Sequence, residues 1–243
     1  MQTCNYSACN ISAGEPIIEK ETSSNAYEKN MNRILPLLIL AGLFMLSLHN
    51  YLIFHSIIEI FTVVIGFAIF LLAWNSRKHL DNNFFLFLGL SFLYVSALDL
   101  LHALAYKGMG VFIGYDANLP TQLWIAARYV QSLSLLAAFS FFHRRLNIPF
   151  TLTGYTLITA LLIAAIFTGL FPLCYVEGTG LTLFKKLSEY CISLILLSCI
   201  ALFWRKKKEL DENVGRWLIL AAALTIGTEL VFTLYLSIYD FSN

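Results

Sequence analysis

The sequence predicts an all-α integral membrane protein, a bundle of about seven transmembrane helices, and two properties of its composition carry the prediction. Of the 243 residues, 58% are hydrophobic and only 13% are charged, whereas about a quarter of the residues in an average soluble domain are charged. The 16 Lys and Arg nearly balance the 15 Asp and Glu, so the chain lacks the basic field that nucleic-acid binding requires. We therefore expect the lipid bilayer as a partner and no nucleic acid.

The apolar residues gather in seven segments, each close to the roughly 20 residues that a helix needs to cross a bilayer. In chain order these predicted spans are 34–50, 52–74, 84–106, 121–142, 150–172, 182–204 and 216–238. The connections between them are short and leave little room for a soluble catalytic domain. Nucleotide-binding and zinc-protease motifs are absent from the sequence, so we expect no enzymatic activity.

The first 32 residues are polar, with acidic and basic residues among Ser, Asn and Thr. They are too long and too acidic for the start of a cleaved signal peptide. We expect residues 1–32 to form a flexible cytoplasmic tail and residues 33–243 to form one multi-helix membrane domain.

Basic residues set the expected orientation, because Lys and Arg near span ends resist translocation. The connections after the second, fourth and sixth spans are basic, whereas the opposite connections carry only Lys107, Lys185 and Lys186. The basic connections contain Arg77, Lys78, Arg144, Arg145, Arg205, Lys206, Lys207, Lys208 and Arg216. This predicts a multi-pass protein of the plasma membrane with its N-terminus in the cytoplasm and its C-terminus outside.

Ionisable residues inside the predicted spans are the main functional signal, because such groups are costly in a bilayer and usually face a cavity or a partner. At about 1.5 Å per residue, five helices each place one such group roughly 10–12 Å below the outer surface. We expect an outward-facing polar cavity in which Arg128 pairs with Asp99 or Glu59. The candidate ligand-binding residues are His55, Glu59, Asp99, His102, Trp124, Arg128, Glu189 and Glu229.

Several kinds of site agree with this layer. It could bind a polar ligand, hold a metal through His55 and His102, or relay a proton. The structural alternatives are that an Arg–carboxylate pair only joins two helices and that Glu189 and Glu229 are satisfied structural carboxylates. The number of ionisable groups favours a functional cavity, because one pair accounts for only two of them.

Four blocks of sequence resemble the bacterial membrane-associated sensor domain of the third type, a MASE family, over about residues 34–243. They are FHSIIEIF at 54–61, AWNSR at 73–77, ALDLLHALAYKGMGVF at 97–112 and ANLPTQLWIAARY at 117–129. Six candidate residues match the family's motif positions: His55, Glu59, Asp99, His102, Trp124 and Arg128. Glu189 and Glu229 rest on the depth argument alone.

The resemblance implies a signal-perception (input) domain of a histidine kinase or of a cyclic-di-GMP enzyme. Family members normally have an eighth helix that leads to the output module, so we expect a domain incomplete at its C-terminus. The identity of the ligand stays open, as does a metal or a haem-like cofactor, and so does a homodimer or a separate signalling partner. The alternative function is a proton- or ion-coupled small-molecule transporter, and the lack of ionisable residues in the inner halves of the spans argues against it.

Overall fold

The computed structural model describes residues 17–80 and 82–234, and the side chains of residues 31–80 and 82–233. In this part of the chain it contains seven α-helices, one 3-10 turn and one two-stranded hairpin. Helix α1 belongs to one unit, residues 1–49, and α2 to α7 belong to a second, residues 50–243. Three expected features lie outside the described residues: the start of the tail (1–16), the end of the seventh span (235–238) and the C-terminus.

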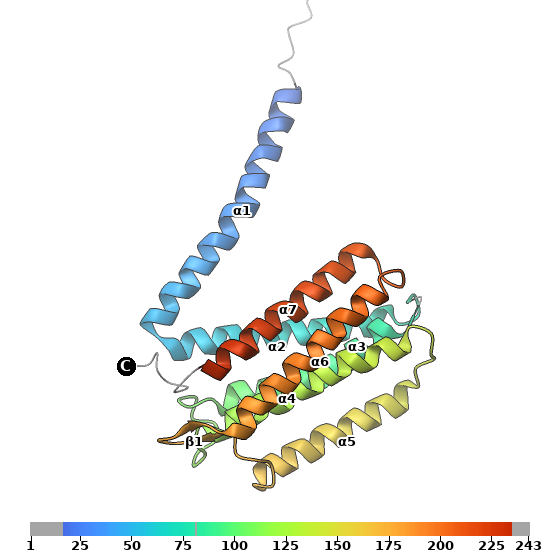
Figure 1. Ribbon diagram of the computed structural model, residues 1–243. Coiled ribbons are helices and arrows are strands. Elements are labelled where there is room, and N and C mark those ends of the chain that lie inside the picture. Colours follow the sequence, from blue (N-terminus) through green and yellow to red (C-terminus); the bar gives the residue numbers. More distant parts are fainter. Residues whose placement is uncertain (1–16, 81, 235–243) are drawn as a thin grey trace, which may run out of the picture. The chain divides into compact units, whose positions relative to one another are not determined.

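The helices of the second unit follow the predicted spans, with ends shifted by a few residues. They are α2 Tyr51–Ser76, α3 Phe84–Ala105, α4 Asn118–Ala138, α5 Ile148–Phe167, α6 Leu183–Arg205 and α7 Glu212–Leu234 (Figure 1). Polar caps set several of the starts, because a side-chain oxygen can accept a hydrogen bond from a free N–H of the first turn. Asn50 accepts from Ile53 at the start of α2, and Asn147 accepts from Phe150 at the start of α5.

Helix α1 runs from Ile17 to His49, and this corrects the expected tail. The segment 17–32, which we expected to be flexible, is helical. It is rich in Glu and Lys, which are good helix formers although they are polar. The apolar part of α1, Met31–His49, is long and hydrophobic enough to cross a membrane.

Helix α4 is at the centre of the second unit, where it packs against α3, α5 and α6. In the described residues, six helices are long and apolar enough to span a membrane, and α4 is not among them. Its 21 residues reach about 31 Å, which suffices for a crossing. Polar residues such as Gln122 and Arg128 lower its hydropathy, and both are buried against neighbouring helices. The central position of α4 thus explains how a span can be polar.

A short hairpin joins α5 to α6, with strand β1 (Tyr175–Val176) antiparallel to β2 (Gly180–Leu181). We did not expect strands in this connection. The first turn of α4 holds the hairpin in place: Asn118 Oδ1 accepts hydrogen bonds from the backbone N–H groups of Cys174 (2.8 Å) and Tyr175 (3.0 Å). This anchoring fixes Leu181 near the start of α4.

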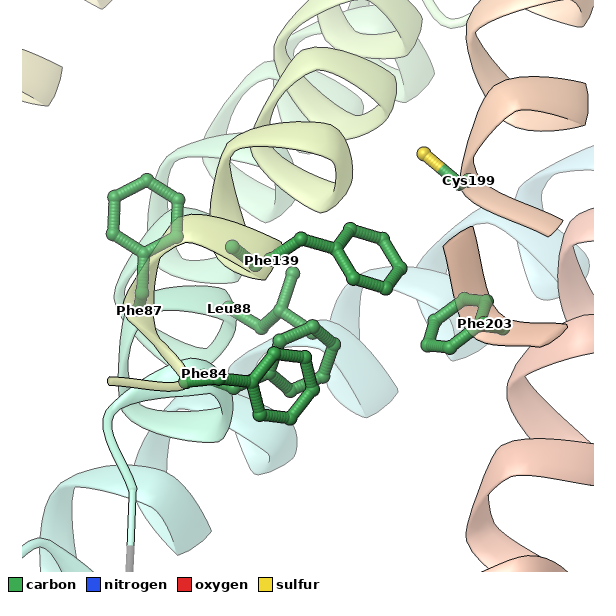
Figure 2. Packing of buried hydrophobic residues seen from close by; sticks show 8 residues of the cluster. Phe84, Phe87, Leu88, Phe139, Cys199 and Phe203 are labelled. Carbon is green, nitrogen blue, oxygen red and sulfur yellow. The ribbon is translucent and has the colours of Figure 1, made fainter. Parts of the chain in front are cut away.

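At the opposite end of the same helices, an aromatic cluster joins the start of α3 to the ends of α4 and α6 (Figure 2). It consists of Phe84, Phe87, Leu88, Ala138, Phe139, Phe142, Cys199 and Phe203. Phe84 stacks on Phe142 with ring centroids 4.5 Å apart, and Phe139 meets Phe203 edge to face at 4.7 Å. Aromatic pairs of this kind add to the stability from area burial, so this end of the bundle is closed by apolar packing.

Candidate functional site

Two glycines bring α2 and α3 into close contact. A Cβ atom at Gly66 would lie 2.0 Å from Ser96 Oγ, and one at Gly89 would lie 2.1 Å from the Cβ of Ala73. Glycine is therefore needed at both positions, because small residues allow helix backbones to approach each other closely. The two contacts are two turns apart along each helix, and together they fix the register of the antiparallel pair.

The same register places the predicted polar residues of α2 and α3 opposite each other. Two further turns toward the start of α2, Glu59 lies beside His102 of α3. One more turn brings His55 to the level of Tyr106, and the two rings lie with centroids 3.8 Å apart. The packing of two glycines far from the site thus positions three candidate residues at this end of the bundle.

His55, Glu59 and His102 form a compact cluster of possible metal ligands. One ligand atom from each residue lies within 4.8 Å of the other two. Glu59 Oε1 is 3.9 Å from His102 Nε2, and the rings of His55 and His102 meet edge to face with centroids 5.7 Å apart. Glu59 and His102 are buried, and His55 is half-buried. Two imidazoles and one carboxylate therefore converge on one point at the edge of the bundle.

A backbone hydrogen bond determines which nitrogen of His102 faces the cluster. His102 Nδ1 lies 2.7 Å from the carbonyl oxygen of Pro120. Because a carbonyl oxygen only accepts, Nδ1 must carry a hydrogen, and Nε2 of the neutral ring keeps its lone pair. His55 Nε2 is buried and has no hydrogen-bond partner among the described residues. Both imidazoles thus have a nitrogen that is available to a ligand.

Arg128 on α4 forms the predicted ion pair with Asp99 on α3, with Nη2 2.8 Å from Oδ1. The guanidinium also donates to Gln131 Oε1 at 2.5 Å and lies 4.5 Å from the ring centroid of Trp124. Asp99 is 3% exposed and Arg128 is 8% exposed. The cation is therefore fixed on three sides, and its charge is matched by the carboxylate of Asp99.

Lys185 corrects one expectation. We expected it among the cations of an outer connection, but it lies in the first turn of α6, is 4% exposed and forms an ion pair with Glu189 one turn further along. Residues four apart share a helix face, and this spacing was the signal that could have identified the pair. The count of cations in the outer connections is thereby reduced to Lys107 and Lys186.

Glu229 on α7 is fully buried. Among the described residues, neither of its carboxylate oxygens has a hydrogen bond of good geometry. Its charge interacts with Arg128 and Lys185, although each of these cations has a closer carboxylate. Glu229 therefore shares its counter-ions rather than having one of its own.

A cavity with a volume of about 130 Å³ opens beside these residues. The five helices expected to bound it, α2, α3, α4, α6 and α7, all contribute to its lining, together with Tyr106 after α3 and Leu181 of β2. The lining residues are Tyr51, His55, Glu59, His102, Tyr106, Thr121, Trp124, Leu181, Lys185 and Phe232. Four of the eight candidate residues therefore line the cavity: His55, Glu59, His102 and Trp124. Asp99, Arg128, Glu189 and Glu229 lie outside its lining.

Sequence reasoning missed the other lining residues. Lys185 had the spacing signal described above. Leu181 had none, because it reaches the cavity only through the unexpected hairpin. Tyr51, Tyr106, Thr121 and Phe232 are apolar or weakly polar residues of a kind that is common in helices and at helix ends. Their position depends on how the helices pack.

The ionisable residues at this end form what we call the polar layer: His55, Glu59, Asp99, His102, Arg128, Lys185, Glu189 and Glu229. It contains four carboxylates but only two side chains that are permanently or normally cationic. Arg128 and Lys185 are paired with Asp99 and Glu189, so Glu59 and Glu229 have no cation of their own among the described residues. The layer can therefore accept additional positive charge, as protons or as a bound cation.

None of the three cysteines with described side chains contributes to this donor set. Cys174 lies in the connection between α5 and α6, and burial raises the pKa of its thiol to about 12. A protonated thiol is a poor metal ligand, because the thiolate is the form that binds. The chemistry available beside the cavity is thus that of imidazole, carboxylate and amine groups.

The fold defines a class of protein: a helical, multi-pass membrane protein with a buried polar site at one end of its bundle. The chain matches the family of the MASE3 membrane-associated sensor domain over residues 46–243. It therefore belongs to this family, and the predicted all-α membrane fold and the predicted resemblance are confirmed. Comparisons with curated proteins and with solved structures gave no match.

Proposed function

We propose that this chain is the signal-perceiving input domain of a bacterial signalling protein, and that its ligand binds in the cavity beside the polar layer. Membership of a sensor-domain family supports the perception role. The proposed output is that of a histidine kinase or of a cyclic-di-GMP enzyme, reached through a following module, a second copy or a separate partner. The lipid bilayer of the plasma membrane is the surrounding medium.

One observation carries the proposal: a membrane domain keeps eight ionisable groups together at one end, four of which line a cavity, although such groups are costly inside a bilayer. Helix association alone needs no more than one satisfied pair between neighbours. In the described part of the chain, Glu59 and Glu229 have no cation of their own, so they add cost without adding a pair. A binding function accounts for why groups of this kind are kept beside a cavity.

The direction of access follows from the charges of the connections. The basic connections after α2, α4 and α6 lie at the end with the aromatic cluster, and basic residues favour the cytoplasmic side. The cavity is at the opposite end, and we propose that it faces the outside of the cell. With Lys185 buried in the polar layer, the contrast between the two sides is stronger than the sequence alone indicated.

Transport is the alternative function, and it needs a polar path between the two ends. The aromatic cluster occupies the other end of α3, α4 and α6 and is built from Phe, Leu, Ala and Cys side chains. Phe84, Phe139 and Phe203 contact one another there. This packing favours a cavity with access from one side, which suits a sensor better than a transporter.

A sensor must pass a change at the cavity to the other membrane face, and this can be measured on the purified full chain. Thr121 lines the cavity and is 6% exposed. In a background whose five native cysteines are replaced, Thr121→Cys is modified with a small cationic methanethiosulfonate reagent. We expect the rate of tryptic cleavage in the basic turn 206–208 to change about fivefold or more, the range of typical coupling between sites.

Val111→Cys is the matched control, because Val111 is 50% exposed at the same end and does not line the cavity. Its modification should leave cleavage at residues 206–208 unchanged. Equal effects from both positions, or no effect when Thr121→Cys is fully modified, would contradict a perception role for this cavity.

A further inference from the structure

We propose that His55, Glu59 and His102 bind one divalent transition-metal ion, with a coordination position left open toward the cavity. This inference rests on the proposed function and names the chemistry of its site: the ion, or a Lewis base bound to it, is what the domain perceives. Three independent features of the structure support it: the placement of the donor atoms, the state of the two imidazoles and the charge balance.

The donor atoms are close to the spacing of a metal site. Around a tetrahedral Zn²⁺ with bonds of about 2.0–2.2 Å, neighbouring donors lie roughly 3.3 Å apart. The three donors here all lie within 4.8 Å of one another, and Glu59 Oε1 is already 3.9 Å from His102 Nε2.

The two imidazoles are prepared for ligation. Metal-binding histidines usually donate their second ring N–H to a carbonyl or carboxylate, which fixes the tautomer and the ring orientation. His102 has this arrangement through its Nδ1 contact with Pro120. His55 Nε2 is buried without a hydrogen-bond partner in the described part of the chain, and a buried polar atom without a partner is costly. A metal ion would bind His102 Nε2 and one ring nitrogen of His55.

The charge balance favours a cation at this point of the polar layer. Asp99 and Glu189 each pair with a cation. Glu59 lies within ion-pair distance of His102. His102 is uncharged when its Nε2 keeps the lone pair, so it does not balance the charge of Glu59. A divalent ion at Glu59 would neutralise that carboxylate. Arg128 and Lys185 cannot do so without leaving the pairs they form.

The donor set also selects the ion. Two imidazoles and one carboxylate suit Zn²⁺, Fe²⁺, Co²⁺ or Ni²⁺, whereas Ca²⁺ and Mg²⁺ prefer oxygen ligands. Three protein ligands leave at least one position free, which is the pattern of metal sites that bind a further molecule. The cavity that faces this position is lined by Lys185, Thr121 and aromatic side chains, so a small anionic or neutral Lewis base is the ligand class that fits.

The test uses the purified full chain in detergent, stripped with a chelator and then titrated with Co²⁺ or Zn²⁺ under equilibrium dialysis. We expect one tightly bound ion per chain and, for Co²⁺, an absorption spectrum of low coordination number. X-ray absorption of the loaded protein should show two imidazole ligands and oxygen. This last measurement needs no variant, so it holds even where a substitution prevents folding.

Glu59→Gln and His102→Gln should each weaken binding by about 100-fold or more, because even loss of an outer partner of a metal ligand costs 10–100-fold. His143→Gln is the matched control: its side chain is 68% exposed and pairs with Glu209 at the other end of the bundle. Its metal affinity should equal that of the unaltered protein. Size-exclusion profiles and circular dichroism verify that each variant is folded.

Several results would overturn the inference: no stoichiometric Co²⁺ or Zn²⁺, sulfur in the metal shell, equal affinity in Glu59→Gln, or a haem absorption band in the purified protein. Failure of this site differs from failure of the proposed function. If the chain binds no metal but modification of Thr121→Cys still alters cleavage at residues 206–208, the sensor function stands and the metal does not. If metal binds but that coupling is absent, the ion is structural.

Discussion

The two ends of α3, α4 and α6 are built on opposite principles. At one end, apolar packing joins Phe84, Phe139 and Phe203. At the other end, the polar layer depends on hydrogen bonds and ion pairs such as that of Asp99 with Arg128, in which each buried charge needs a partner. Apolar packing suffices to hold helices together, so the cost of the charged end agrees with the perception role that we propose for it.

The comparison also shows where each end is vulnerable. Truncation of a side chain in the aromatic cluster leaves a cavity, and the loss of stability grows with the volume of that cavity. Removal of one member of a buried ion pair leaves a charge without a partner, which costs about 3–5 kcal/mol. The effects of two substitutions on the free energy of unfolding should therefore be strongly non-additive at the polar end. At the aromatic end, the loss of stability should scale with the side-chain volume that is removed.

The largest effect is expected for Arg128→Ala, which should lower the free energy of unfolding by about 3–5 kcal/mol because Asp99 is left buried and unpaired. The quantity is measured by denaturant titration of the protein in detergent micelles, followed by circular dichroism. The double variant Asp99→Asn with Arg128→Gln removes both charges and should recover much of the loss. A cost below about 1 kcal/mol for Arg128→Ala would contradict the pairing.

Phe203→Ala should cost about 3 kcal/mol through the cavity it opens in the aromatic cluster. Phe203 is 2% exposed and contacts Phe139. Because this end has no part in binding, Co²⁺ affinity at the polar end should be unchanged, as measured by the dialysis described above. A parallel loss of metal affinity would show that the two ends are not separable.

Gly66→Ala should destabilise the protein by about 1–3 kcal/mol, because the added methyl group would overlap Ser96 Oγ. It should also weaken metal binding, since the α2–α3 register positions Glu59 against His102. Gly154 on α5 is the control, because a Cβ there would meet nothing within 4 Å. Gly154→Ala should stabilise by about 0.5–1 kcal/mol, and equal effects at both glycines would contradict the role of the close contact.

The smallest effect is expected at the exposed ion pair between Arg216 and Glu212, whose side chains are 71% and 78% exposed. Exposed pairs of this kind contribute about 0.3–0.5 kcal/mol on a helix. Arg216→Ala should therefore leave the unfolding midpoint nearly unchanged. A loss comparable to that of Arg128→Ala would mean that burial is not what distinguishes the polar layer.

The sequence predicted the helices well, because most of them are runs of apolar residues and several begin at polar caps such as Asn50 and Asn147. It also limited the expected partner of Arg128 to Asp99 or Glu59, and the structure pairs Arg128 with Asp99. Both predictions rest on one-dimensional spacing along helices. The family resemblance was confirmed for the same reason, because its motifs are local blocks of sequence.

What the sequence could not predict depends on packing. The predicted span 182–204 already contained Lys185, and α6 begins at Leu183; the burial of Lys185 against Glu189 depends instead on how the first turn of α6 packs against its neighbours. The hairpin at Tyr175 to Leu181 depends on hydrogen bonds to Asn118, far away in the chain. The α2–α3 register depends on Gly66 and Gly89, which a hydropathy profile treats as neutral.

The central claim, that the polar end receives the signal from outside the cell, is tested most directly by the sidedness of thiol labelling in intact cells. Thr121→Cys beside the cavity and Ser132→Cys, buried deeper on the same helix, are exposed to a membrane-impermeant cationic thiol reagent. Our account predicts labelling of Thr121→Cys from outside and none of Ser132→Cys until the protein is denatured. Labelling of Thr121→Cys only after the cytoplasmic face is opened would contradict it, and labelling from both sides would favour the transporter.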